Sequence, residues 1–273
     1  MIVRSGSFPD SGFSPNSHPD PHSDPQPAGF QLEETIDLDG YAVLPGALSE
    51  AEAAFWLETI EQTHPDLSVS ASAPGSGLAR NLLRESPAVR EVACCEEVRA
   101  PVEAVLGPHC FAVRANLFNR SADAAWGVPW HQDLTIPVEG HTWTSDFSCW
   151  SQNDGVRHVQ PPEEILQKML VARIHFDPCD EDGGPLRVIP ASHRAGRIAS
   201  AHIPCWIDWV RSRFCPVPCG GILLMRPLLL HASTPARCPG SRRVLHILFA
   251  AVDLPDGLEW YDRVMPVRFR QAA

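Results

Sequence analysis

Long apolar runs and an excess of positive charge are both missing from this 273-residue sequence. A membrane-spanning helix needs about 18 or more consecutive apolar residues, and the richest apolar stretch, residues 222–230, is interrupted by Arg226 and Pro227. The net charge is −11, whereas nucleic acids and anionic membranes are bound through basic surfaces. We therefore expect neither a membrane span nor a nucleic-acid partner.

The sequence also lacks a cysteine framework and a secretory signal. Its nine cysteines are scattered, and neither the adjacent pair Cys94 and Cys95 nor the pair Cys215 and Cys219 has a second pair at zinc-binding spacing. The N-terminus has no charged start followed by an apolar core. We expect free thiols in a cytoplasmic protein, without structural zinc.

Residues 1–28 differ in composition from the remainder of the chain. They are dominated by Pro, Ser, Gly, Asp and His, and such a segment buries too little apolar surface to offset its ordering entropy. This composition predicts a disordered tail at 1–28, including His18 and His22, and one domain over 29–273. The 44% hydrophobic content is typical of a globular protein.

Two helical regions are indicated by their end signals. Ser49 followed by Glu52 forms a capping box, and apolar residues from Ala53 to Ile60 then recur at helical spacing. The second region begins at Ser86 and Pro87 and ends at Gly107 and Pro108. Pro101 is expected to split or kink it.

From Cys110 onward the apolar pattern has a period of two residues. Alternating segments begin at Phe111, Leu170 and Val244, and Pro/Gly-rich turns separate them. Many short strands with such breaks are typical of an antiparallel sandwich or jelly roll. We therefore expect a mainly β fold with flanking helices, specifically a double-stranded β-helix of the cupin type.

The stretch VPWHQDLTIP at residues 128–137 places an imidazole and a carboxylate one residue apart, at His131 and Asp133. A surface hydrogen bond would explain this pair as well as a metal would. A facial metal site needs a second histidine from a distant strand, and the sequence has twelve histidines. His231 is the preferred candidate because it ends the buried strand predicted over residues 222–230. Six others, among them His175 and His246, are not excluded by position.

Arg242 follows His231 after a loop, and an antiparallel return of the chain brings the two close together. A guanidinium beside a metal site suits a dicarboxylate cosubstrate, because arginine binds a carboxylate in two-pronged geometry. Arg243 is the alternative. On an alternating strand it points the other way, so Arg242 is preferred.

These residues jointly resemble the phytanoyl-CoA dioxygenase (PhyH) family of iron(II)/2-oxoglutarate oxygenases. The resemblance lies in His131-x-Asp133, His231, Ser233 two residues later and Arg242 eleven residues later. It extends to WHQD at 130–133, GGPLRVIPASH at 183–193 and CGGILLMRPLLLHAS before RRVLHI. It covers roughly residues 30–255.

The resemblance implies roles for particular residues. His131, Asp133 and His231 would bind Fe(II), while Arg242 and Ser233 would bind the distal carboxylate of 2-oxoglutarate. Reaction with O2 would give succinate, CO2 and an oxidised substrate. Halogenating relatives lack the carboxylate ligand, so the presence of Asp133 favours hydroxylation or a related oxidation.

Several further residues are weaker candidates. Gln132 and Asn116 are candidates for additional cosubstrate contacts, with a turn hydrogen bond and a β-edge position as the alternatives. Four tryptophans lie near the motif in sequence, and Trp130 and Trp150 are candidates for substrate contact, although core packing is the commoner role. Arg173 is expected to hold a polar or anionic group or, equally, to join a buried salt-bridge network.

Three functions compete at this stage. The first is an iron(II)/2-oxoglutarate dioxygenase of a small molecule. The second is a non-catalytic β-sandwich that keeps the oxygenase fold as a binding module, and the third is a zinc-dependent hydrolase. The intact ligand set and Arg242 argue against the second, and a hydrolase has no use for Ser233 and Arg242 at this spacing. The acidic balance mildly disfavours a CoA substrate, unless Arg187, Arg194 and Arg197 form a local basic patch. The oligomeric state is not indicated.

Overall fold

The computed structural model of the chain describes residues 28–63, 77–120, 127–141, 146–237 and 242–266. The predicted tail at 1–28 lies outside these residues, apart from Ala28, where the first helix begins. None of the described helices is both long and apolar enough to cross a bilayer.

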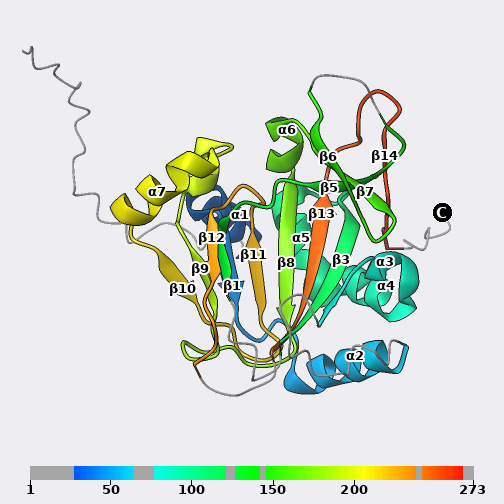
Figure 1. Ribbon diagram of the computed structural model, residues 1–273. Coiled ribbons are helices and arrows are strands. Elements are labelled where there is room, and N and C mark those ends of the chain that lie inside the picture. The colour runs from blue at the N-terminus through cyan, green and yellow to red at the C-terminus, as the bar shows by residue number, and fades with distance from the viewer. Residues whose placement is uncertain (1–27, 64–76, 121–126, 142–145, 238–241, 267–273) are drawn as a thin grey trace, which may run out of the picture.

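The central element is a six-stranded antiparallel sheet, sheet A, which runs through the middle of the molecule (Figure 1). Its strands, in spatial order, are β1 (Tyr41–Leu44), β11 (Ile222–Met225), β8 (Met169–His175), β13 (Arg242–Ala250), β3 (Phe111–Arg120) and β2 (Leu78–Ala79). The alternating segments predicted from Phe111, Leu170 and Val244 are three of these strands, and the prediction is confirmed.

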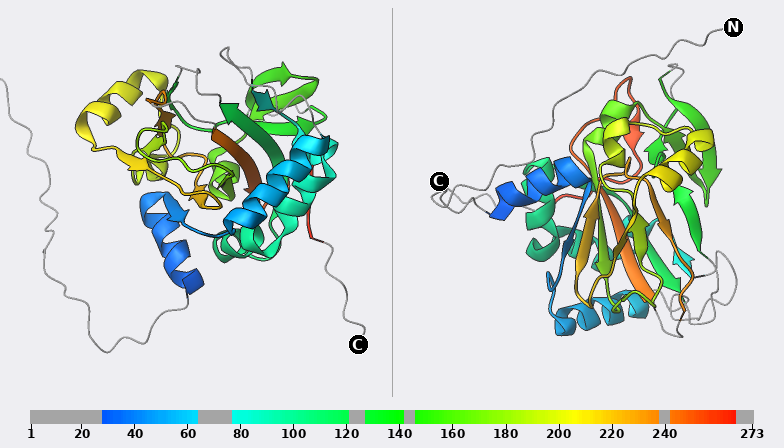
Figure 2. Two further views of the ribbon diagram at one scale, coloured as in Figure 1. Left: turned by 90° about the horizontal axis from the view of Figure 1, so that it is seen from below. Right: turned by 90° about the vertical axis from the view of Figure 1, so that its left-hand side faces the viewer.

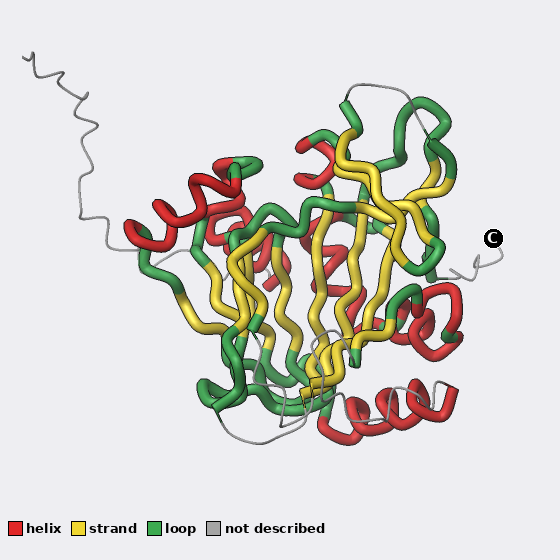
Figure 3. The backbone as a smooth tube through the Cα atoms, viewed as in Figure 1, coloured by secondary structure: helices red, strands yellow, loops and turns green. Residues whose placement is uncertain are grey.

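Two four-stranded sheets complete the β structure, and all their pairings are antiparallel (Figure 3). Sheet B contains, in spatial order, β10 (Arg213–Cys215), β9 (Leu186–Val188), β12 (His231–Ser233) and β4 (Val128–His131). Sheet C contains β14 (Glu259–Trp260), β5 (Ile136–Glu139), β7 (Val156–Gln160) and β6 (Ser148–Asn153).

Helices cover one face of sheet A, and sheet B lies against the other (Figure 2). The helices on the first face are α1 (Ala28–Asp39), α2 (Glu50–Thr63), α3 (Leu82–Glu85), α4 (Pro87–Cys94) and α5 (Glu96–Leu106). Helix α6 (Glu163–Gln167) packs in the cluster on the opposite face, and α7 (Ile203–Trp209) follows the 3-10 turns η2 (Ser192–Ala195) and η3 (Ser200–His202) and packs in a third cluster. Both faces of sheet A are buried, because alternate residues enter different apolar clusters. Ala172 and Ile247 pack with the helices, whereas Val171 and Leu248 pack in a second cluster on the opposite face.

The predicted helix starts are confirmed. The Ser49 backbone N–H donates to Glu52 Oε2 at 2.7 Å, and the Glu52 N–H donates back to Ser49 Oγ at 3.2 Å, which is the reciprocal capping box. Ser86 caps α4 by accepting a hydrogen bond from the Val89 N–H at 3.4 Å.

The prediction that Pro101 splits or kinks the helical region is wrong as to the split. The helical region divides instead at Cys95, which has an extended backbone (φ −65°, ψ 152°), and Pro101 lies inside α5. Proline removes the hydrogen bond to the carbonyl four residues earlier, here that of Glu97. Glu97 is exposed, so water can satisfy its carbonyl.

The strand predicted over residues 222–230 ends earlier than expected. β11 ends at Met225, the chain turns, and β12 begins at His231 in the other sheet. Pro227 has no N–H to donate to a ladder, and a Leu229 N–H to Arg226 O bond of 3.0 Å closes the turn. His231 therefore begins a strand of sheet B and does not end one in sheet A.

A backbone contact at Gly220 should contribute to the free energy of unfolding, because it connects sheet A to the segment before α2. Gly220 has φ +74°, its carbonyl accepts from the Leu48 N–H at 2.9 Å, and an added Cβ would lie 2.1 Å from Leu48 O. Gly46 has φ +68° and open space around it. Gly46→Ala should therefore cost about 1 kcal/mol of backbone strain, and Gly220→Ala roughly 2–4 kcal/mol. Denaturant unfolding checks this, and equal losses would contradict it.

Candidate metal centre

His131 and His231 lie side by side on paired strands. β4 and β12 are antiparallel, and the two histidines are direct register partners. Their ring centroids are 4.2 Å apart, and the ring planes make an angle of 52°. The sequence therefore brings together two imidazoles from positions one hundred residues apart, through strand pairing alone.

The same local hydrogen bond orients both rings. His131 Nδ1 lies 2.8 Å from Pro129 O, and His231 Nδ1 lies 2.8 Å from Leu229 O. A carbonyl only accepts, so each Nδ1 carries the hydrogen and each Nε2 presents a lone pair. This is the tautomer that binds a metal through Nε2. Burial lowers the pKa of His231 to about 4, which keeps its ring neutral at physiological pH.

Asp133 completes the cluster. One ligand atom from each of His131, Asp133 and His231 lies within 4.8 Å of the others. Asp133 Oδ2 is 3.9 Å from His231 Nε2 and is buried, and it has no hydrogen-bond partner within the described part of the chain. Burial opposes ionisation of this carboxyl, but the neighbouring His231 and His246 outweigh it and the pKa is lowered.

A buried carboxylate oxygen without a partner is costly, and a bound cation would satisfy it. Two imidazoles and one carboxylate on one side of a cavity are the donor set of non-haem iron(II) oxygenases. The three residues therefore fit an iron(II) ion.

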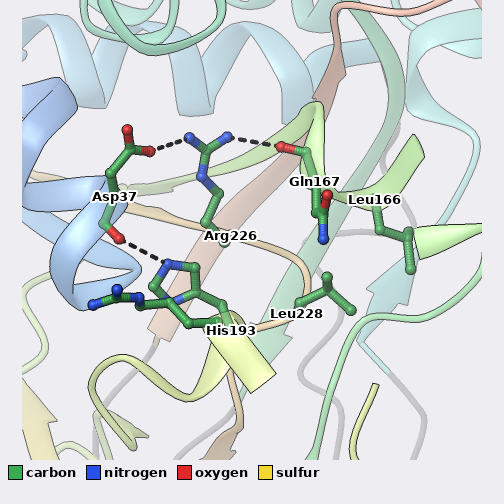
Figure 4. Close-up of a pocket in the computed structure, with 7 residues that line it drawn as sticks. Asp37, Leu166, Gln167, His193, Arg226 and Leu228 are labelled. Carbon is green, nitrogen blue, oxygen red and sulfur yellow. Dashed lines mark hydrogen bonds and ion pairs between the residues drawn. The ribbon is translucent and has the colours of Figure 1, made fainter. Parts of the chain in front are cut away.

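One turn, residues 226–230, holds two of the three ligands, Asp133 and His231, in place. The Asp133 N–H donates to Pro227 O at 2.9 Å, and the His231 ring is bonded to Leu229 O. The turn is itself anchored by Arg226, whose Nη2 lies 2.8 Å from Asp37 Oδ1 and whose Nη1 donates to Gln167 O at 3.2 Å (Figure 4). Helix α1 therefore supports the metal centre indirectly through this ion pair.

Gln132 belongs to this scaffold and not to the cavity. Its Nε2 donates to Leu228 O at 2.6 Å and to Gly196 O at 2.8 Å, and its Oε1 accepts from the Ile198 N–H at 2.8 Å. The side chain is buried and bonded at both ends of its amide. Of the two interpretations of Gln132, a turn hydrogen bond therefore describes these contacts better than a cosubstrate contact does.

A cavity of about 100 Å³ adjoins the three ligands. It is lined by Phe118, Val128, His131, Asp133, Arg173, Leu186, His231, Ser233, Arg242, Val244 and His246. Ser233 Oγ accepts from the Val128 N–H at 3.2 Å across the β4–β12 pair. Asn116 is the register partner of His246, and its Oδ1 is buried without a partner among the described residues.

The two adjacent arginines of β13 point in opposite directions. Arg242 lines the cavity and is steadied by donating from Nη1 to the carbonyls of Gly183 and Gly184. Arg243 pairs instead with Asp177 at 2.6 Å and with Glu61 at 3.2 Å. These carboxylates raise the pKa of Arg243 above its ordinary value. Alternation along the strand therefore places Arg242, and not Arg243, beside the metal ligands.

Arg173 and His246 also face the cavity. Arg173 Nη1 donates to His246 Nδ1 at 3.0 Å, so the neutral His246 ring carries its hydrogen on Nε2, which is 3.9 Å from Asp133 Oδ2. Position in the sequence does not distinguish His246 from the other histidines that were candidates for the metal site. Its spacing of four residues from Arg242 on an alternating strand was the signal that could have selected it.

The two tryptophan candidates lie away from the cavity lining. Trp130 packs against the cluster of Ile189, Ile198 and Leu230, and the Arg187 guanidinium lies 5.5 Å from its ring. Trp150 stacks on His141 at 4.2 Å. Core packing therefore describes both better than substrate contact. Trp126 and Trp143 lie outside the described residues.

Several solved structures share the fold of this chain. The epimerase SnoN from nogalamycin biosynthesis, described as a non-haem α-ketoglutarate-dependent enzyme, is 16% identical with a TM-score of 0.62, covering 89% of this chain and 96% of that one. EctD from S. alaskensis is 20% identical with a TM-score of 0.61, covering 84% and 79%. The predicted jelly-roll fold is confirmed. No curated protein matches the chain in sequence.

Comparison with protein families gives a match that spans most of the chain. The model of the Phytanoyl-CoA dioxygenase (PhyH) family matches residues 36–244. This range contains all three members of the His–Asp–His cluster and Arg242. The chain therefore belongs to the phytanoyl-CoA dioxygenase family.

Proposed function

We propose that this protein hydroxylates a small molecule in an iron(II)- and 2-oxoglutarate-dependent reaction that releases succinate and CO2. The observation that carries the proposal is the convergence of His131, Asp133, His231 and Arg242 on one cavity. Membership of the family supports the same reaction class. Hydroxylation is preferred because Asp133 is present, so all three protein ligands are in place.

In this proposal His131 Nε2, Asp133 and His231 Nε2 hold the iron. When bound, iron(II) together with 2-oxoglutarate and O2 supplies the oxidising power for the substrate. The protein contributes ligand geometry and a secluded cavity. The hydrogen bonds from the rings to Pro129 O and Leu229 O keep both Nε2 atoms aimed at the same point.

Arg242 and Ser233 are proposed to bind the distal carboxylate of 2-oxoglutarate. Arg242 and Ser233 line the same cavity, and Nη1 of Arg242 is already fixed by the carbonyls of Gly183 and Gly184. A guanidinium that is oriented before binding loses less entropy when a carboxylate arrives. Asn116, with its unpartnered Oδ1, is retained as a further candidate for a cosubstrate contact.

The competing functions are less well supported. A binding module that had lost catalysis would not need three oriented ligands together with Arg242. A zinc hydrolase would bind the same ligands but would have no cosubstrate for Arg242 to hold. We also propose a cytoplasmic location. The eight cysteines in the described regions are all unpaired, as expected in a reducing compartment.

The ligand assignment predicts the behaviour of three variants. His131→Ala, Asp133→Ala and His231→Ala should each weaken binding of Fe(II), or of Co(II) as a spectroscopic probe, by about 100-fold or more, because each removes a direct ligand. Titration by calorimetry and the visible Co(II) bands measure this.

A matched control is His158→Asn. His158 is buried and has the same type of ring bond, from Nδ1 to Val156 O at 3.2 Å, but it does not line the cavity. Its loss should leave metal affinity unchanged. Tight single-site binding in the His231→Ala variant would remove His231 from the ligand set.

The cosubstrate assignment predicts opposite effects for the two arginines of β13. Arg242→Ala should raise the apparent KM for 2-oxoglutarate by a factor that corresponds to about 2–5 kcal/mol. Arg243→Ala should leave that KM unchanged but lower the free energy of unfolding by roughly 1–3 kcal/mol, since it breaks hydrogen bonds to Asp177 and Glu61. Succinate release and denaturant unfolding measure the two effects. The reverse pattern would reject the assignment.

A further inference from the structure

The cavity beside the metal ligands carries more positive charge than its proposed contents neutralise. Arg173 and Arg242 line it, and Asp133 is the only carboxylate among its described lining residues. Metal-binding histidines are neutral. Iron(II) and the 2-oxoglutarate dianion cancel formally, so Asp133 balances one guanidinium and the other remains.

Arg173 is the guanidinium whose positive charge is not balanced. Within the described regions no carboxylate lies within 4.0 Å of it, and Asp177, two residues further along the chain, is taken by Arg243. The predicted alternative of a buried salt-bridge network is therefore not what surrounds Arg173. Burial and the nearby Arg242 lower its pKa to about 10, the direction expected for a buried cation without adequate compensation.

The orientation of Arg173 leaves one edge of its guanidinium without a hydrogen-bond partner among the described residues. Nη1 donates to His246 Nδ1 at 3.0 Å, and the guanidinium carbon lies 5.4 Å from the centroid of the Phe118 ring. Nε is buried and has no partner among the described residues. The edge formed by Nε and Nη2 is the one that meets a carboxylate with two parallel hydrogen bonds.

A second cation, Arg114, lies near His246, on the other side of β13 from Arg173. Arg114 is buried on β3, its Nη1 reaches Thr135 O only at 3.5 Å, and its Nε has no partner within the described chain. Arg114 adds to the positive potential at His246 and Asp133 without contributing to the cavity lining. A single additional negative charge in the cavity would therefore be attracted by two guanidiniums.

We propose that the substrate carries a carboxylate, which binds the free edge of Arg173 while 2-oxoglutarate occupies Arg242. This inference rests on the proposed function, because it assumes that Arg242 is committed to the cosubstrate. A carboxylate is preferred because it is planar and matches the two-pronged geometry of the guanidinium. His246 fixes the fork, so it acts as a positioning residue for the substrate.

The test uses the iron(II)-loaded full chain under argon, with 2-oxoglutarate bound and its charge-transfer absorption band as the readout. Short aliphatic and aromatic monocarboxylates are titrated in parallel with their methyl esters, which have similar size but no charge. We expect the acids to perturb the band at concentrations about 10-fold or more below those of their esters. A panel in which no acid binds more tightly than its ester would overturn the proposal.

Two variants localise the effect. Arg173→Gln should weaken binding of the acids by about 10–100-fold, the loss expected for charge-assisted hydrogen bonds, and should leave the Kd for 2-oxoglutarate within about threefold. Arg187→Gln is the matched control. Arg187 lies over Trp130 and Phe214 and does not line the cavity, so its loss should change neither affinity.

The melting temperature separates a binding role from a structural one. Removal of an uncompensated buried charge should leave the melting temperature of Arg173→Gln equal to that of the wild type or higher. A large decrease would indicate a structural role. If Arg173→Gln weakens 2-oxoglutarate binding as strongly as Arg242→Ala does, Arg173 binds the cosubstrate and the proposal fails. Absence of any 2-oxoglutarate band in the wild type would instead reject the proposed function.

Discussion

The pairing of β4 with β12 is the contact on which the metal centre depends. It sets His131 directly opposite His231 and places Ser233 across from Val128. β4 is the edge strand of sheet B, so it is held from one side only. The turn at 226–230 compensates, because its backbone carbonyls bond Asp133, Gln132 and His231 in succession. A short strand and a well-anchored turn together fix the positions of the three metal ligands.

The charge distribution around the cavity follows from strand alternation. Two consecutive arginines on β13 serve different purposes, since Arg243 ties β13 to Asp177 and Glu61 while Arg242 faces the metal ligands. Arg173 on β8 is opposite His246 on β13, and this register brings it to the same cavity wall.

Much of this arrangement could be predicted from sequence where the signal is local or periodic. The capping box at Ser49, the cap at Ser86 and the alternation in β3, β8 and β13 depend on neighbouring residues, and all were found in the structure. The preference for Arg242 over Arg243 used the same two-residue period. The structure departs from the expectations where tertiary contacts determine the conformation or the partners of a residue. Pro101 is tolerated because Glu97 is exposed, and Gln132 is consumed by backbone groups more than sixty residues away. No local pattern reveals either circumstance.

The separation of the metal ligands along the chain has a consequence for folding. His131 and His231 are paired across a loop of one hundred residues, and closing such a loop carries an entropic penalty that must be met before the ligands meet. In the unfolded chain His131 and Asp133 are close together, but His231 is not held near them. An iron ion should thus bind the native state almost exclusively and act as a reversible cross-link between the two halves of the domain, so that metal supply raises the population of folded protein.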